Sequence, residues 1–144
     1  MKQQVAIVTL GISELARSKR FYAEGFGWTP VFEDAETALY QMNGFVLGTW
    51  CRRALEEDMC RPAAAGSAAF TLAHNVASPE EVQPLLDCLA AAGGRILRPA
   101  DPPPHGGLRG YVADPDNHAW EIIWNPAWVV DDRGGVIYTP SCAR

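Results

Sequence analysis

One order of elements occurs twice along this 144-residue chain, and the repeat constrains the fold more than any other feature. Each half is predicted to run as a strand, a helix and three further strands. The expected helix N-caps, Ser13 and Ser78, stand 65 positions apart (13 to 78), a period that indicates a duplicated module. Because neither half alone can bury both its helix and its sheet, we expect the halves to pack together and leave a concave surface.

The first half is predicted from an apolar, β-branched strand at residues 5–12 and a helix that begins after Ser13 and stops at Gly25 and Gly27. Three short strands follow, at residues 28–32, 37–42 and 45–50. Asn43-Gly44 separates the last two strands, and this dipeptide is typical of a tight hairpin. This half therefore reads as a βαβββ module.

The second half repeats that order after a strand at residues 68–76. Ser78 is the expected N-cap, Pro79 takes the first helical position and Glu81 completes a predicted capping box. One apolar stripe marks the helix, formed by Val82, Leu85, Leu86, Leu89 and Ala90. Strands at residues 95–97, 108–113 and 118–124 complete the module, and residues 114–117 form the turn between the last two.

These patterns predict an α+β fold in which two βαβββ modules curve a mixed sheet around one shared cavity. We expect one structural domain, with the first module at residues 1–50, a linker with a possible short helix at 51–66, and the second module at 67–125. A tail with a strand at 136–138 occupies residues 126–144.

Composition excludes several classes of protein. Hydrophobic residues make up 48% of the chain and charged residues 20%, which is typical of a globular domain. The net charge of -5 and the lack of a basic patch argue against a nucleic-acid partner. Nothing approaches the ~18 apolar residues of a membrane span or a signal-type segment, so we expect a cytoplasmic protein. Its cysteines, none in a C-x-x-C pair, are predicted to be free thiols.

Two segments carry a resemblance to a known family. Residues 13–22, SELARSKRFY, resemble a helix start of the vicinal oxygen chelate superfamily, and residues 110–121, GYVADPDNHAWE, resemble its hairpin. This superfamily includes glyoxalase I, bleomycin-resistance proteins, fosfomycin-resistance enzymes and extradiol dioxygenases. The resemblance spans roughly residues 4 to 125 and is greatest to bacterial "glyoxalase family" proteins. It implies the βαβββ duplication independently, whereas members differ widely in function.

The resemblance also implies where a divalent metal such as Zn, Ni, Mn or Fe would bind. Enzymes of the superfamily hold it with four side chains, and the last of these matches Glu121. The positions that correspond to two other ligands hold Ile7 and Thr71, and the strand at residues 45–50 offers no His, Asp or Glu. One ligand of four is therefore retained. We expect no family-type metal site and no cofactor.

Two histidines remain as alternative metal ligands. His74 lies three residues beyond Thr71, so strand alternation places it on the opposite face unless a β-bulge intervenes. His105 lies in a Pro-rich loop at the expected mouth of the cavity. For both, a structural or surface role is the simpler interpretation. Glu121 could face the cavity and act as an acid, a base or a ligand anchor, or could merely bond to strand neighbours.

The remaining aromatic residues divide by alternation. Trp120, Ile122 and Trp124 point away from Glu121 and are predicted to pack under a helix. Tyr111 matches a position that contacts substrate in fosfomycin-resistance enzymes, and tryptophans at segment ends could line a pocket or an interface. The expected ligand-binding residues are Ile7, Thr9, Trp50, Thr71, His105, Tyr111 and Glu121.

Three functions fit these expectations. The favoured one is a metal-free pocket protein that binds or sequesters an apolar or aromatic small molecule, as bleomycin-resistance proteins do. The second is a metal-dependent lyase or dioxygenase with rearranged ligands, formed by Glu121, His74 and His105. The third is a metal-free enzyme that uses Glu121 as acid or base. The resemblance also implies pairing into a homodimer.

Overall fold

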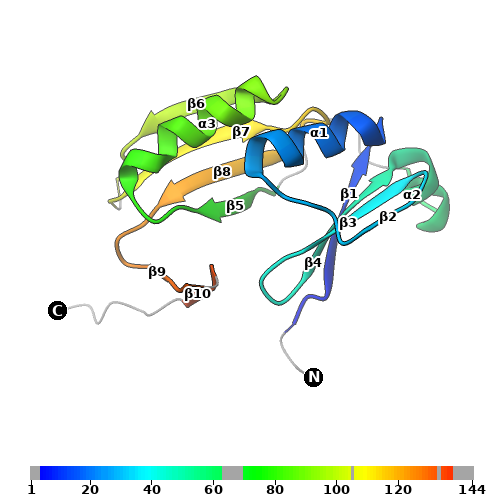
Figure 1. Ribbon diagram of the computed structural model, residues 1–144, viewed down its shortest axis with the longest axis horizontal. Helices are drawn as coiled ribbons and strands as arrows, with labels where there is room; N and C mark the ends of the chain where they lie inside the picture. The colour runs from blue at the N-terminus through cyan, green and yellow to red at the C-terminus, as the bar shows by residue number, and fades with distance from the viewer. Residues whose placement is uncertain (1–3, 63–69, 105, 133, 138–144) are drawn as a thin grey trace.

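The computed structural model describes residues 4–62, 70–104, 106–132 and 134–137. Within these residues the chain forms two βαβββ halves of α+β class, as the sequence predicts (Figure 1). None of the described helices has the length and apolar character needed to cross a membrane.

The first sheet is built by residues of the first half. It contains β1 (Ile7–Ile12), β2 (Phe32–Glu33), β3 (Thr37–Gln41) and β4 (Val46–Cys51), in the order β1-β4-β3-β2. β1 runs parallel to β4, because α1 (Leu15–Phe26) returns the chain to the same end of the sheet. The hairpin at residues 42–45 joins β3 to β4 in antiparallel pairing, and α2 (Arg52–Asp58) follows β4.

The second sheet repeats this topology with β5 (Leu72–Asn75), β6 (Arg95–Asp101), β7 (Leu108–Ala113) and β8 (Ala119–Trp124). Its order is β5-β8-β7-β6, with β5 parallel to β8. A short 3-10 helix, η1 (Pro79–Glu81), leads into α3 (Val82–Ala91), which covers one face of the sheet. The tail forms a small hairpin of β9 (Val129–Val130) and β10 (Val136–Ile137).

The halves meet through their helices, because α1 packs against α3 (Figure 1). Gly25 of α1 permits this close approach, since a Cβ there would lie 2.6 Å from the Leu89 side chain. Buried side chains from both helices and both sheets join one core, which includes Leu10, Phe21, Tyr22, Leu86, Leu89, Val112 and Ile122. Each helix therefore lies between its own sheet and the other half.

The 114–117 turn provides polar links between the halves. The buried Tyr22 hydroxyl of α1 donates to Asp114 Oδ2 at 2.9 Å. Ser13 donates from its backbone nitrogen and its hydroxyl to Asp116 Oδ1, at 2.8 and 2.6 Å. Arg17 donates to the same oxygen at 3.0 Å. The two sequence segments that carried the family resemblance thus contact each other.

These links correct the predicted caps. The N-cap of α1 is Glu14 rather than Ser13, and Glu14 makes no side-chain cap bond. The Ser13 hydroxyl instead donates to Asp116 and accepts from Arg17. Ser78 is the N-cap of η1, with Pro79 at its predicted first position, but the expected capping box does not form. Glu81 instead accepts from the backbone nitrogen of Ala77.

Some predicted strand bounds are also wrong. The strand expected at 28–32 is reduced to β2, because residue 28 still bonds back to the end of α1. The strand expected at 95–97 continues to Asp101 through two register shifts, which strand periodicity cannot reveal. α2 lies in the expected linker. Residues 68–69 of one predicted strand and residue 138 of another lie outside the described residues.

Candidate functional site

The first sheet has one face that its helix does not cover. Leu10 and Ile12 of β1 point toward α1 and are fully buried, so Ile7 and Thr9 face the opposite side. Ile7 is 47% exposed there. We call this side the open face of the first sheet.

Two glycines shape the open face of the first sheet. Gly48, the register partner of Thr9, has no side chain, and a Cβ there would contact the side chains of Ile7 and Thr9 at 3.4 Å. At the other end of β1, the side chain of Leu55 in α2 lies 3.4 Å from the Cβ position of Gly11. The open face is therefore covered beside Gly11 and accessible around Ile7.

Trp50 lies on this same face. It follows Thr49, which is fully buried on the α1 side, and its register partners are Gly11 of β1 and Thr37 of β3. Its indole is partly exposed. The first sheet therefore brings together three of the predicted ligand-binding residues, Ile7, Thr9 and Trp50.

The open face of the second sheet, on the side away from α3, carries the principal polar pair. Tyr111 of β7 and Glu121 of β8 are direct register partners, and the Tyr111 hydroxyl donates to Glu121 Oε1 at 2.8 Å. Their neighbours Val112, Trp120 and Ile122 point the other way, into the core. Glu121 thus faces the side that the alternation predicts.

The environment of the pair keeps the phenol protonated. Partial burial raises the pKa of Tyr111 above its ordinary value of 10.0, and the hydrogen bond to Glu121 raises it further. The hydroxyl therefore remains a donor at neutral pH. Glu121 keeps a second oxygen and further lone pairs with which to accept hydrogen bonds from a bound molecule.

Thr71 adjoins β5 on the same open face, two residues from Ala73, which is the register partner of Glu121. Its hydroxyl donates to the backbone oxygen of Ala119 at 3.0 Å. The second sheet therefore brings together Thr71, Tyr111 and Glu121. The six described ligand-binding candidates form two groups, one on each sheet.

Two arginines on the open face of the second sheet were missed by the sequence interpretation. Arg109 precedes Tyr111 by two residues on β7, and its side chain is only 11% exposed. Arg98 of β6 is the register partner of Tyr111. Both ion-pair with Asp101, Arg98 through two hydrogen bonds of 2.6 and 2.8 Å, and these bonds lower the pKa of Asp101.

A signal for one of these arginines was present in the sequence. Arg109 and Tyr111 are two residues apart on a single strand, so strand alternation puts Arg109 on the same face as Tyr111, which the family resemblance had marked as a ligand contact. Arg98 could not have been placed in this way, because register shifts interrupt β6 on both sides of it.

His74 lies on the opposite side of β5 from Thr71, in agreement with the alternation. Its imidazole makes edge contacts with the rings of Phe26 at 5.4 Å and Trp28 at 6.1 Å. Burial lowers the pKa of His74 below its ordinary value of 6.5. The second sheet therefore separates His74 from Glu121, and the two do not form one ligand set.

The donor groups on the open faces do not fit a divalent metal. Glu121 is already an acceptor for Tyr111, Ile7 has no donor atom, and the Thr71 hydroxyl is directed to a backbone oxygen. Among the residues that the structure describes, no three His, Cys, Asp or Glu side chains gather in a metal-binding group. His105, the other proposed ligand, lies outside the described residues.

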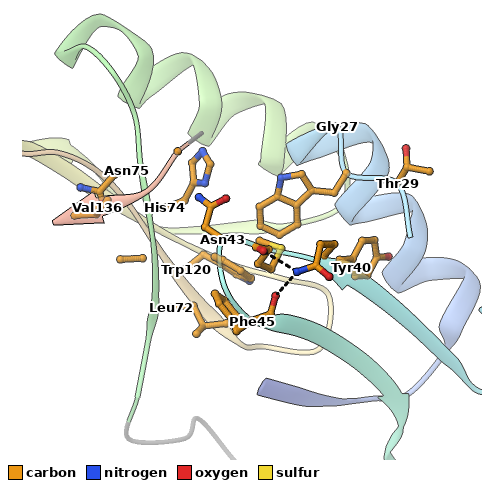
Figure 2. A pocket seen from close by; sticks show the side chains of 15 residues that line it. Gly27, Thr29, Tyr40, Asn43, Phe45, Leu72, His74, Asn75, Trp120 and Val136 are labelled. Carbon is orange, nitrogen blue, oxygen red and sulfur yellow. Dashed lines mark hydrogen bonds between the residues drawn. The ribbon is translucent and has the colours of Figure 1, made fainter. Parts of the chain in front are cut away.

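A pocket of about 500 Å³ lies elsewhere, between the two halves on the side of β5 that carries His74 (Figure 2). It is lined by residues before β2, on β3 and in the β3–β4 hairpin, on β5 and in the tail, and by Trp120 of β8. None of the six described candidates on the open faces is among its lining residues. The sequence pattern gives no indication of this pocket, because its walls come from five separate segments.

Comparison with known proteins shows which family has this architecture. Residues 4–122 match the profile of the Glyoxalase/Bleomycin resistance protein/Dioxygenase superfamily. A glyoxalase-related enzyme from Fulvimarina pelagi, known from a crystal structure, is 56% identical in sequence to this chain. The two structures superimpose with a TM-score of 0.93, and the match covers 95% of this chain and 99% of that one. A comparison with curated proteins finds no match.

More distant structures share the fold alone. Hypothetical protein SA1046 from S. aureus superimposes with a TM-score of 0.76 at 17% identity, over 87% of this chain and 95% of that one. The fosfomycin resistance protein FosX from Listeria monocytogenes has a TM-score of 0.68 at 20% identity, over 87% and 95% of the two chains. The profile match and the similarity to the Fulvimarina enzyme establish the family. This chain belongs to the Glyoxalase/Bleomycin resistance protein/Dioxygenase superfamily.

Proposed function

We propose that this protein binds a small aromatic or apolar compound on its open sheet faces, without a family-type metal. The observation that carries the proposal is the Tyr111–Glu121 pair, a prearranged donor and acceptor on an accessible face. Such a pair can orient a ligand by its polar group, while Trp50 and Ile7 supply apolar surface.

The proposed site is completed by a second copy of the chain, because its two groups of residues lie on separate sheets. β1 and β5 are edge strands of the described sheets, so each offers a free edge to a partner. Exposed apolar side chains accompany both edges: Val5 and Ile7 at β1, and Phe70 next to β5. These features support a homodimer that joins the first sheet of one protomer to the second sheet of the other.

The assembly is tested by analytical ultracentrifugation of the wild type and Ile7→Lys. We expect the wild type to sediment as a dimer and Ile7→Lys as a folded monomer. Val31→Lys is the matched control, since Val31 is also an exposed apolar residue but lies away from β1, and it should remain dimeric. A monomeric wild type would refute the shared site.

Ligand binding is tested by thermal unfolding against a panel of neutral and charged aromatic compounds and antibiotics. A ligand present at 100 times its Kd should raise the free energy of unfolding by about 2.7 kcal/mol. Glu121→Gln should weaken that binding, because the amide no longer offers a charged acceptor. If no compound in the panel stabilises the protein, the proposal fails.

A catalytic role is the second candidate, favoured by the description of the 56% identical Fulvimarina protein as a glyoxalase-related enzyme. Glu121 would then act as acid or base, or would hold a metal with other ligands in a lyase or dioxygenase. In the first case, Glu121→Gln abolishes turnover and leaves binding nearly intact. In the second, elemental analysis of protein purified without chelator finds stoichiometric Zn, Ni, Mn or Fe, which disappears in Glu121→Ala.

A further inference from the structure

The pocket between the halves is separate from the open sheet faces. It opens on the helix-facing side of the second sheet, whereas Glu121 and Tyr111 point to the other side of that sheet. Its volume of about 500 Å³ is within the range of small-molecule sites. A ligand bound there would not touch the proposed site.

Aromatic rings form much of the pocket's wall. Trp28 stacks on Phe26 with ring centroids 4.3 Å apart and nearly parallel planes, and Trp120 meets Trp28 edge-on at 5.6 Å. Phe45 and Leu72 contribute further apolar surface (Figure 2). Because each tryptophan is fixed by other rings, the wall is rigid before a ligand arrives. Such walls favour a flat, aromatic guest.

Polar side chains occupy six of the fifteen lining positions: Thr29, Tyr40, Gln41, Asn43, His74 and Asn75. His74 lines the pocket and makes no hydrogen bond with any described residue; Asn43 and Asn75 carry amides at the same pocket (Figure 2). Gln41 is fixed separately, since its amide donates to the backbone oxygens of residues 42 and 45 and so holds the hairpin. The pocket thus combines apolar walls with donors and acceptors.

The tail also contributes to the pocket. Gly134 and Val136 line it, and a Cβ on Gly134 would lie 2.9 Å from Asn43 Nδ2. Gly134 of the tail therefore lies directly against the β3–β4 hairpin. Two halves and the tail together define the pocket.

Charge defines the ligand class. No Asp, Glu, Lys or Arg is among the fifteen described residues that line the pocket. Since an ion would lose hydration there without gaining a countercharge from these described residues, they favour an uncharged compound. The open face of the second sheet differs, because it carries Arg98, Asp101, Arg109 and Glu121.

We propose that this pocket is a second binding site, specific for an uncharged planar aromatic compound of two or three rings that carries a hydrogen-bond donor and acceptor. His74 and Asn43 bond the polar substituent, and the Trp28 and Trp120 walls contact the rings. None of the six ligand-binding candidates on the open faces lines this second site, so its ligand can be tested separately.

The test compares 2-naphthamide with 2-naphthoate, which share size and shape and differ in charge. Titrations of the full chain, followed by calorimetry at pH 7.5, should give a Kd below about 1 mM for the amide and at least tenfold weaker binding of the carboxylate. No amide binding, or equal affinity for the two compounds, would overturn the proposal.

Variants locate the site. His74→Leu and Asn43→Ala should each weaken 2-naphthamide binding at least fivefold. Asn43 is exposed on a hairpin, so Asn43→Ala should fold and test the proposal even if His74→Leu does not. Glu121→Gln should leave the amide's affinity unchanged. Wild-type affinity in Asn43→Ala together with a loss in Glu121→Gln would place the compound on the open face and refute a second site.

Discussion

Replacing Tyr22 with Phe should destabilise the protein, because it removes one buried hydrogen bond that joins the two halves. The Tyr22 ring and the Asp114 carboxylate are both almost fully buried, and the hydroxyl donates to Asp114 Oδ2 at 2.9 Å. Burial, followed by the nearby Asp114 charge, holds the pKa of Tyr22 well above its ordinary value of 10.0. The hydroxyl is therefore a donor over the whole working pH range.

The expected cost follows from what Asp114 retains. A hydrogen bond to a charged group contributes about 1.5–3 kcal/mol. After the substitution Asp114 still accepts from the backbone nitrogens of Asp116 and His118 and lies 2.8 Å from His118 Nδ1, so its charge is not left without partners. Phe also preserves the ring contacts. We therefore expect a loss near the lower end, about 1.5–2 kcal/mol.

Urea unfolding at fixed protein concentration measures this loss. The midpoint should fall at constant m, and the Tm should fall by about 3–8 °C for a chain of this size. Tyr111→Phe is the matched control, since it removes a tyrosine–carboxylate bond on a partly exposed face and should cost less than about 1 kcal/mol. Equal costs for the two variants, or a cost below about 0.5 kcal/mol for Tyr22→Phe, would refute the reasoning.

Three further predictions concern packing, pH and metal. Gly25→Ala should cost about 1 kcal/mol, because the new Cβ displaces only the end of the Leu89 side chain, its contacts with Ala92 Cβ and the Leu89 backbone at 3.5 Å are ordinary, and alanine favours the helix. Gly94→Ala should cost more than about 2 kcal/mol, since its Cβ would lie within 2.9 Å of two backbone oxygens; comparable urea midpoints for the two variants would contradict this. Because burial lowers the pKa of His74, the unfolded chain takes up its proton at a higher pH than the folded chain. Stability should therefore fall as pH drops below about 6.5, by at most about 1.4 kcal/mol per pH unit, and urea titrations of His74→Gln should lack this component. Dialysis against EDTA should shift the Tm measured by calorimetry by less than about 1 °C, because no described residue joins Glu121 in a metal-binding group; a larger fall, restored by added metal, would contradict the proposed function.

Alternation along a single strand correctly predicts that Trp120 and Ile122 point away from Glu121 and into the core. Glu121 and Tyr111 face away from the core, and Trp120 and Ile122 are buried, because a regular strand directs successive side chains to opposite faces. The same rule separates His74 from Thr71. Alternation does not predict the side on which Arg98 lies, because register shifts in β6 interrupt the two-residue period of the strand.

Helix caps are less predictable than helices. Ser13 has the residue type and position of an N-cap, but Asp116, 103 residues later, binds its hydroxyl. A local rule cannot predict this arrangement, because Asp116 reaches Ser13 and Arg17 only after the halves have packed, and it is Arg17 that donates to the hydroxyl oxygen a cap would use. The ion pairs of Arg98 and Arg109 with Asp101 likewise depend on the register of β6 and β7.

Local signals in the chain suffice for the repeated βαβββ order, the α+β class and the faces of the regular strands, because hydrophobic periodicity and turn residues act over a few positions. Only the tertiary structure shows that the predicted ligand-binding residues lie on two separate sheets. It also shows that Asp114 accepts a hydrogen bond from α1 and that Asp116 accepts one from the residue before α1. The aromatic pocket between the halves likewise appears only in the packed structure. These features depend on the distance and orientation of segments far apart in the chain, and such relations arise only when the two modules come together.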